Sequence, residues 1–148
     1  MIYLGADHRG FELKERLKKR LIDEGLLVTD LGNDHLDPND DYVDYAERVT
    51  KSVVENEENR GILLCGSGVG VDMVANKIDG GRCALVSDAQ RAIQSREHED
   101  ANILALPADL LGEESVYEIT KAFLETEFSG ESRHARRLEK MEEIEDEN

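Results

Sequence analysis

The feature that most constrains the fold of this chain is the alternation of two hydrophobic patterns along its length. Short apolar runs, typical of buried strands, are each followed by a segment in which apolar residues recur every three or four positions, as on one face of a helix. The apolar runs occupy residues 1–6, 26–31, 61–65, 83–86 and 101–106. This order predicts a three-layer, Rossmann-like α/β fold, in which a five-stranded parallel sheet has helices on both faces.

The length of 148 residues fits one domain, and no repeat or low-complexity linker suggests a second. We therefore treat residues 1–148 as a single domain that ends in a segment, 130–148, which is first basic and then acidic. The formal net charge of −16 argues against a nucleic-acid partner, because neutralising phosphates requires a basic surface.

Targeting signals and cofactor motifs are absent from the sequence. No apolar run is long enough to span a membrane, and the N-terminus lacks the pattern of a signal peptide, so we expect a cytoplasmic protein with no membrane partner. Cys65 and Cys83 make no disulfide framework and should be free thiols. Neither has metal-ligand spacing with the four histidines, and we expect no metal and no other cofactor.

A glycine-rich turn follows the third apolar run. Gly66, Gly68 and Gly70 alternate with Ser67 and Val69, and a helical pattern begins directly afterwards. Because glycines leave backbone N–H groups uncovered at a helix N-terminus, the turn could hold an anion or a developing oxyanion. The spacing matches neither a dinucleotide fingerprint nor a P-loop, and a turn needed only for packing is the alternative.

Cys65 ends the strand that leads into this turn. A thiolate there would be stabilised by the helix N-terminus and the backbone amides, which makes Cys65 a candidate base or nucleophile. The alternative is a buried cysteine that acts as a small hydrophobe. That is the interpretation we prefer for Cys83, which lies inside a strand.

Other polar residues also follow strands. Asp7 and His8 come after the first apolar run, and Ser87 and Asp88 come after the fourth. Open parallel sheets bind ligands at the carboxyl ends of their strands, so we expect these residues to converge with the glycine turn on one edge. His98 lies near the end of a helical segment, and a lone histidine such as His8 or His98 is more often structural than catalytic.

The last helical segment begins with basic residues. Arg133 and Arg137 are four positions apart and share one helix face, where they could clamp a phosphate, although solvation is the usual explanation for such a surface pair. A narrow apolar stripe runs along the same segment, formed by Ala135, Leu138, Met141 and Ile144. The stripe suggests packing on a partner subunit, with packing on the parent domain as the alternative.

Six blocks of sequence carry a family resemblance when they are taken together. They lie at residues 5–14, 42–46, 65–70, 75–77, 95–102 and 133–137, and they begin with G-A-D-H-R-G-F-E-L-K and include C-G-S-G-V-G. In order and spacing they resemble the type B ribose-5-phosphate isomerases and the related galactose-6-phosphate isomerases. The resemblance covers essentially the whole chain.

The resemblance implies a metal-free aldose–ketose isomerase that works through an enediolate, in a homodimer or dimer of dimers whose active sites draw on two chains. By the same resemblance, Cys65 would be the base, since Val71 stands where another branch carries a glutamate. Ser67 and the amides of residues 66–70 would hold the enediolate oxygens. His98 would open the sugar ring and Asp7 would contact hydroxyl groups. The phosphate would be held by His8, Arg133 and Arg137.

Two positions depart from the family pattern. Glu99 stands where members usually have an asparagine that contacts the sugar, and Asp109 falls where many carry an arginine that helps to bind phosphate. If Asp109 takes that place, an attraction of about 4 kcal/mol at ~4 Å and an effective ε of ~20 becomes a repulsion of similar size. The first hypothesis is an isomerase of ribose 5-phosphate and ribulose 5-phosphate. The alternatives are an isomerase of a different sugar and a non-catalytic sugar-phosphate-binding protein.

Overall fold

The computed structural model describes residues 1–148, and strands and helices alternate along them as the sequence predicts. The strands are β1 (Ile2–Ala6), β2 (Val28–Asp30), β3 (Arg60–Cys65), β4 (Cys83–Leu85) and β5 (Ile103–Pro107). The helices are α1 (Phe11–Asp23), α2 (Tyr42–Val53), α3 (Val69–Ala75), α4 (Ala89–Glu99), α5 (Glu113–Glu125) and α6 (Ser132–Asp146).

The five strands form one parallel sheet in the order β2-β1-β3-β5-β4. Because all five strands are parallel, Ser87 and Asp88 lie at the same carboxyl edge as Asp7 and the glycine turn, and this prediction is confirmed. The insertion of β5 between β3 and β4 places them one strand farther from Cys65 than the sequence suggests. Asp88 caps α4, since its Oδ1 accepts the N–H of Arg91 at 2.8 Å.

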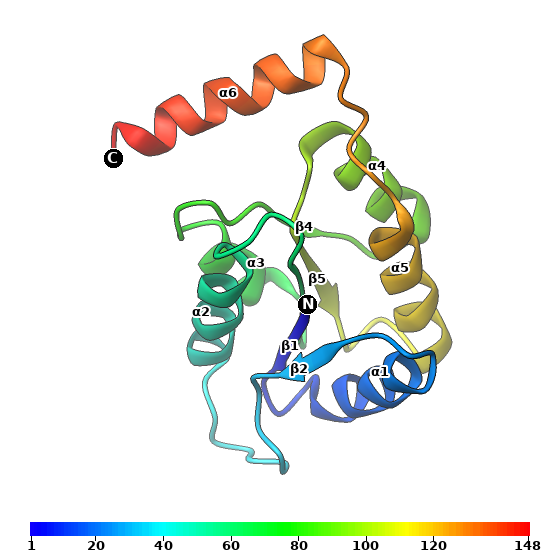
Figure 1. Cartoon of the computed structure of the whole chain (residues 1–148). Coiled ribbons are helices and arrows are strands. Elements are labelled where there is room, and N and C mark those ends of the chain that lie inside the picture. Colours follow the sequence, from blue (N-terminus) through cyan, green and yellow to red (C-terminus); the bar gives the residue numbers. More distant parts are fainter.

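Helices cover both faces of the sheet, as Figure 1 shows. On one face, α1, α4 and α5 pack on alternate strand residues such as Leu4, Leu64 and Leu106. On the other face, α2 and α3 pack on the remaining strand residues, among them Leu63 and Ala105. Each central strand is buried on both sides, which explains why the sequence shows continuous apolar runs there.

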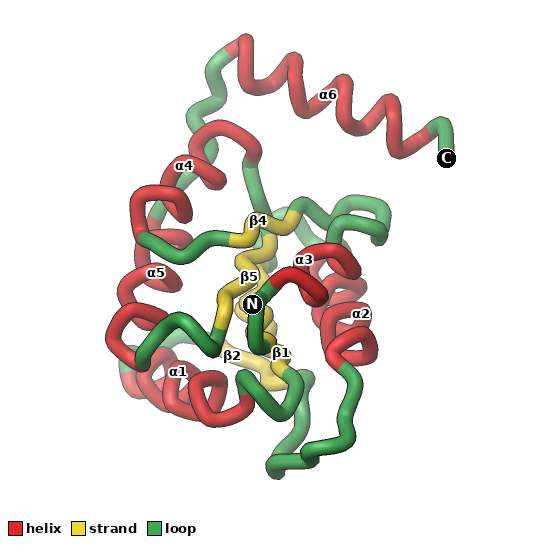
Figure 2. Tube along the Cα trace, turned by 180° about the vertical axis from the view of Figure 1, so that it is seen from behind, coloured by secondary structure: helices red, strands yellow, loops and turns green.

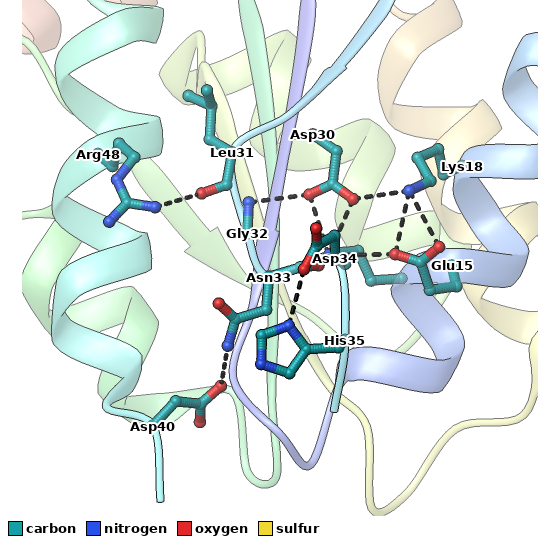
Figure 3. A network of polar contacts seen from close by, with 11 residues as sticks. Glu15, Lys18, Asp30, Leu31, Gly32, Asn33, Asp34, His35, Asp40 and Arg48 are labelled. Carbon is teal, nitrogen blue, oxygen red and sulfur yellow. Dashed lines mark hydrogen bonds and ion pairs between the residues drawn. The ribbon is translucent and has the colours of Figure 1, made fainter. Parts of the chain in front are cut away.

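A charged cluster is buried where β2 meets α1 (Figure 3). The side chain of Lys14 is fully buried, and its Nζ donates to Asp30 Oδ1 at 3.0 Å and to the carbonyl oxygen of Asn33 at 2.7 Å. Lys18 donates to the other oxygen of Asp30 at 2.9 Å, and the N–H of Gly32 donates to its Oδ1 at 2.8 Å. These contacts fix the start of the loop that connects β2 to α2.

Helix α6 lies apart from both layers and is attached near the end of α4, as Figures 1 and 2 show. Only His134 of this helix is buried, while Met141 and Ile144 of its apolar stripe are 45% and 63% exposed. Near its far end, Glu145 accepts the N–H of Gly80 at 2.8 Å. The stripe is thus largely uncovered within one chain. No helix of the structure combines the length and the apolar character needed to cross a membrane.

Candidate active site

The carboxyl ends of β1 and β3 lie next to each other, because these strands pair in parallel with Ala6 opposite Leu64. Asp7 and Cys65 come next in this register. From here the chain continues toward opposite sides of the sheet, to β2 after β1 and to β4 after β3. This is the topological switch point, where open α/β sheets bind their ligands.

Asp7 organises the loop that leads from β1 into α1. The residue is 7% exposed, and its Oδ1 accepts the N–H groups of Arg9 at 3.0 Å and Gly10 at 3.3 Å. Its second carboxylate oxygen takes part in none of these bonds. The arrangement holds the loop against the sheet and leaves that oxygen outside the hydrogen bonds of the loop.

His8 is held by a residue from the next loop, Asp40. The Oδ1 of Asp40 lies 2.9 Å from both the backbone N and the ring Nδ1 of His8, and Asn33 donates to its Oδ2 at 3.1 Å. Because an ionised carboxylate only accepts, Nδ1 carries the proton in this contact. The other ring nitrogen, Nε2, is therefore left for a ligand.

The glycine turn between β3 and α3 requires glycine at its centre. Gly68 has a φ of 76°, in the left-handed region that favours glycine. A Cβ at this position would lie 2.6 Å from Leu85 Cδ1 and 3.0 Å from the carbonyl carbon of Leu106. Both the turn and its close approach to β5 thus depend on Gly68.

The turn presents several backbone donors. The N–H groups of Ser67, Gly68 and Gly70 donate to no backbone carbonyl, while the Ser67 hydroxyl accepts the N–H of Val69 at 3.2 Å. The ring of Tyr42, the first residue of α2, packs against Gly70. The turn therefore offers N–H groups and one hydroxyl beside Cys65, as the sequence predicts.

The two cysteines differ in their surroundings. Cys65 is 5% exposed, at the end of β3, where it adjoins the glycine turn. Burial and the nearby carboxylate of Asp72 raise the pKa of the Cys83 thiol well above its usual value. Cys83 is consequently a protonated, unreactive thiol at neutral pH, and Cys65 is the thiol that adjoins the glycine turn.

Asp109, in the loop after β5, also reaches this edge. Its backbone N–H donates to the carbonyl oxygen of Gly66 at 3.0 Å, and its carboxylate forms an ion pair with Arg9. The negative charge that the sequence places here is thus balanced by a cation from another loop.

The remaining predicted residues lie at the opposite edge of the sheet. His98 follows Ala89 by nine positions on α4, which places it about 13 Å along the helix axis from the carboxyl edge. Its ring stacks on that of His134 with the centroids 4.5 Å apart. Arg133 and Arg137 are exposed on α6, and Arg133 pairs with Glu131 at 2.7 Å.

The start of α6 is firmly joined to the end of α4. Arg96 donates from Nε to the carbonyl oxygen of Thr126 at 3.0 Å, and Ser129 N–H donates to the Glu97 carbonyl at 3.1 Å. Burial, together with the charges of Arg133 and His98, lowers the pKa of His134, which is therefore uncharged at neutral pH. One chain thus keeps His98 and the α6 arginines together and away from Cys65.

A groove of about 940 Å³ separates α6 from the amino ends of β3, β4 and β5. Leu138 and Met141 line it on the helix side, and Arg60, Arg82 and Glu99 line it on the other. Glu99 is exposed there, at the last position of α4. The structure therefore divides the predicted residues into two groups: Asp7, His8 and Cys65–Gly70 at one edge, and His98, Glu99, Arg133 and Arg137 at the other.

Three residues that contact the first group were not predicted as site residues: Arg9, Asp40 and Tyr42. Arg9 and Tyr42 lie in blocks that carry the family resemblance, and that was the only signal for them. Asp40 is one of several aspartates in a polar loop, and nothing in its spacing distinguishes it from its neighbours. Its contact with His8 spans 32 positions and depends on the tertiary structure.

Known proteins resemble this chain over most of its length. The chain is 44% identical over 140 residues to a probable ribose-5-phosphate isomerase B of Mycoplasma pneumoniae, covering 95% of this chain and 91% of the relative. It is 38% identical over 129 residues to a D-erythrulose-4-phosphate isomerase of Pectobacterium atrosepticum, covering 87% and 85%. The structure of ribose-5-phosphate isomerase B from Mycoplasma genitalium with bound ribulose-5-phosphate superposes with a TM-score of 0.95 at 38% identity, covering 99% and 97%.

A family model described as ribose/galactose isomerase matches residues 2–141, which is nearly the whole chain. The match includes both groups of predicted site residues. This protein belongs to the ribose/galactose isomerase family.

Proposed function

We propose that this protein is an aldose–ketose isomerase that interconverts ribose 5-phosphate and ribulose 5-phosphate. The observation that carries the proposal is the position of Cys65, at the switch point of the sheet and beside a turn with unpaired N–H groups, in a chain of this family. Relatives named ribose-5-phosphate isomerase B support this choice of substrate.

The reaction moves one proton between carbons and one between oxygens. The Cys65 thiolate removes the proton from C2 of the open-chain aldose, the C1 oxygen takes up the developing negative charge, and the proton returns at C1. Transfer of the O2 proton to O1 completes the ketose. Ser67 and the N–H groups of residues 66–70 stabilise the enediolate oxygens, which is where preorganised donors lower a barrier most effectively.

The other residues act on the rest of the sugar. Asp7 binds hydroxyl groups with its unused oxygen, and His8 binds the phosphate through Nε2. His98 opens the ring, and Arg133 and Arg137 bind the phosphate. No metal or other cofactor is needed for proton transfer of this kind, and we expect none. We also place the enzyme in the cytoplasm, where its two free cysteines stay reduced.

We further propose that the active form is a homodimer, or a dimer of dimers, with active sites that draw on two chains. The division of the site residues between opposite edges of the sheet supports this, since His98 lies about 13 Å along α4 from the edge that carries Cys65. A two-fold axis would bring α4 and α6 of each chain to the glycine turn of the other. The exposed apolar stripe of α6, with Met141 and Ile144, would be covered by the partner.

The experiment that tests the reaction is Cys65→Ser. We expect interconversion of the two pentose phosphates to be lost while the circular dichroism and the thermal unfolding midpoint stay unchanged, because the hydroxyl is too weak a base at neutral pH. Cys83→Ser is the matched control and should retain activity. Full activity of Cys65→Ser would refute the assignment of the base.

A second candidate is an isomerase of a shorter or otherwise different sugar phosphate. The relative named D-erythrulose-4-phosphate isomerase and the exposed Glu99 favour it. A panel of tetrose, pentose and hexose phosphates, compared by kcat/KM, distinguishes the two. A tetrose phosphate that exceeds ribose 5-phosphate in kcat/KM would establish the second.

A further inference from the structure

The side chain of Arg9 packs against the glycine turn between β3 and α3. Its backbone N–H is bound to Asp7, its guanidinium pairs with Asp109, and the head group lies directly over Gly66. A Cβ at Gly66 would come within 2.6 Å of the Arg9 Cζ. Arg9 is therefore held at both ends over the residue that follows Cys65.

Arg9 is the only arginine or lysine in the loops at the carboxyl edge of the sheet. The five loops that follow the strands, at residues 7–10, 31–41, 66–68, 86–88 and 108–112, contain no other arginine or lysine. The same loops contain many aspartates, including Asp7, Asp40 and Asp109, in a chain with a formal net charge of −16. Within these loops, Arg9 is thus the single permanent cation that an anionic substrate can meet.

The guanidinium retains donors for a ligand. Its one side-chain hydrogen bond runs from Nη2 to Asp109 Oδ2, and its side chain is 56% exposed. A guanidinium has five N–H donors in a planar fork, which suits a phosphate with several acceptor oxygens. Asp109 orients the fork and leaves the remaining N–H groups toward solvent and the turn.

We propose that Arg9 is the phosphate-binding cation that the Cys65-bearing chain itself contributes, oriented by its ion pair with Asp109. This rests on the proposed function in one respect, namely that the substrate of the Cys65 site is a sugar phosphate. Arg9 then supplies, from the loop after β1, the positive charge that the loop after β5 lacks because it carries Asp109.

The chain offers a closely matched control. Arg16 pairs with Glu113 at 3.0 Å, and the side chains are 59% and 43% exposed, compared with 56% and 43% for Arg9 and Asp109. The Arg16 pair joins α1 to α5, and neither residue is among the nearest neighbours of Gly66, Gly68 or Gly70. Loss of either arginine should therefore affect stability similarly, while only loss of Arg9 should affect phosphate binding.

The experiment compares Arg9→Ala and Arg16→Ala in isomerisation of ribose 5-phosphate and in inhibition by inorganic phosphate. We expect Arg9→Ala to raise KM and the inhibition constant of phosphate by about tenfold or more, the effect of losing one charge-assisted hydrogen bond, with a smaller change in kcat. Arg16→Ala should leave all three values unchanged, and Arg9→Lys should lie between wild type and Arg9→Ala.

Equal KM and equal phosphate inhibition in wild type and Arg9→Ala would overturn the proposal. If the wild-type enzyme does not isomerise ribose 5-phosphate, the proposed function fails separately. Calorimetric titration of the same two variants with inorganic phosphate then decides the role of Arg9, because it requires no turnover.

Discussion

His8 and Asp40 are 32 positions apart in the sequence, yet one carboxylate oxygen of Asp40 lies 2.9 Å from both the backbone N and the ring Nδ1 of His8. The side chain of Asp40 is only 5% exposed, and Asn33 binds its other oxygen. The backbone carbonyl of Asn33 in turn accepts a hydrogen bond from the buried Nζ of Lys14. The orientation of His8 thus depends on Asp40 and Asn33, and through Asn33 on the charged cluster where β2 meets α1.

Asp40→Asn tests whether this contact positions His8 for phosphate binding. We expect KM for the sugar phosphate to rise several-fold, on the order of the loss of one charged hydrogen bond, with a smaller effect on kcat because the role proposed for His8 is phosphate binding and not proton transfer. Asp34→Asn is the control, since Asp34 contacts only exposed His35 in the same loop. A fall in kcat with unchanged KM would contradict a positioning role.

Removal of metals should leave the enzyme active. Asp7, His8 and Asp40 bring potential ligand atoms within 4.8 Å of one another, but Asp7 and Asp40 are already engaged in hydrogen bonds that hold the loops. We expect activity to survive dialysis against a chelator and to be unchanged by added Mg²⁺, Mn²⁺ or Zn²⁺. Loss of activity on chelation, restored by one of these ions, would show that the cluster is a metal site.

Asp30→Asn should destabilise the fold at neutral pH. The substitution removes the closer of the two carboxylates that pair with the buried Lys14 and leaves only Glu15, at 3.3 Å. Breaking a buried ion pair of this kind costs about 3 kcal/mol of unfolding free energy. Denaturant unfolding measures the difference. Asp23→Asn removes an exposed pair with Lys19 and should cost less than about 1 kcal/mol.

The effect of Asp30→Asn should also depend on pH. Burial raises the pKa of Asp30, but hydrogen bonds from Lys18, Lys14 and Gly32 outweigh it and lower the pKa below its usual value of 3.8. A lowered pKa in the folded state stabilises the fold above pH 3.8, and this stability is lost as pH falls through the lower folded value. Wild type and Asp30→Asn should therefore converge in stability in strong acid, and a difference that persists there would contradict the electrostatic explanation.

Mixing two inactive variants tests the shared active site. If the proposed roles hold, Cys65→Ser lacks the base and His98→Asn lacks the ring-opening group, so neither variant alone should act on the cyclic sugar phosphate. If sites are built from two chains, a hybrid dimer contains one intact site, and random assortment should restore about a quarter of wild-type activity. Two different affinity tags confirm that hybrids have formed. Tagged hybrids without activity would show that each chain completes its own site.

Asp7, His8 and the turn after Cys65 could be predicted to lie together because they follow the carboxyl ends of parallel strands. The hydrophobic periods locate the strands to within a few residues, and parallel strands place Asp7, His8 and the Cys65 turn at one edge. Ser87 and Asp88 also lie at this edge, but periodicity carries no information on strand order, and the insertion of β5 between β3 and β4 places them one strand farther from Cys65.

The sequence by itself determined the alternation of elements, the parallel sheet, and the position of Cys65 beside a glycine turn, because these follow from local periodicity and from the conformational needs of residues such as Gly68. The tertiary structure decided which distant side chains meet. The pairs Arg9 with Asp109 and His8 with Asp40 join separate loops, and the stack of His98 on His134 keeps the second group of site residues at the far edge. Such contacts depend on strand order and helix packing, which are set by burial of the whole core rather than by any local pattern.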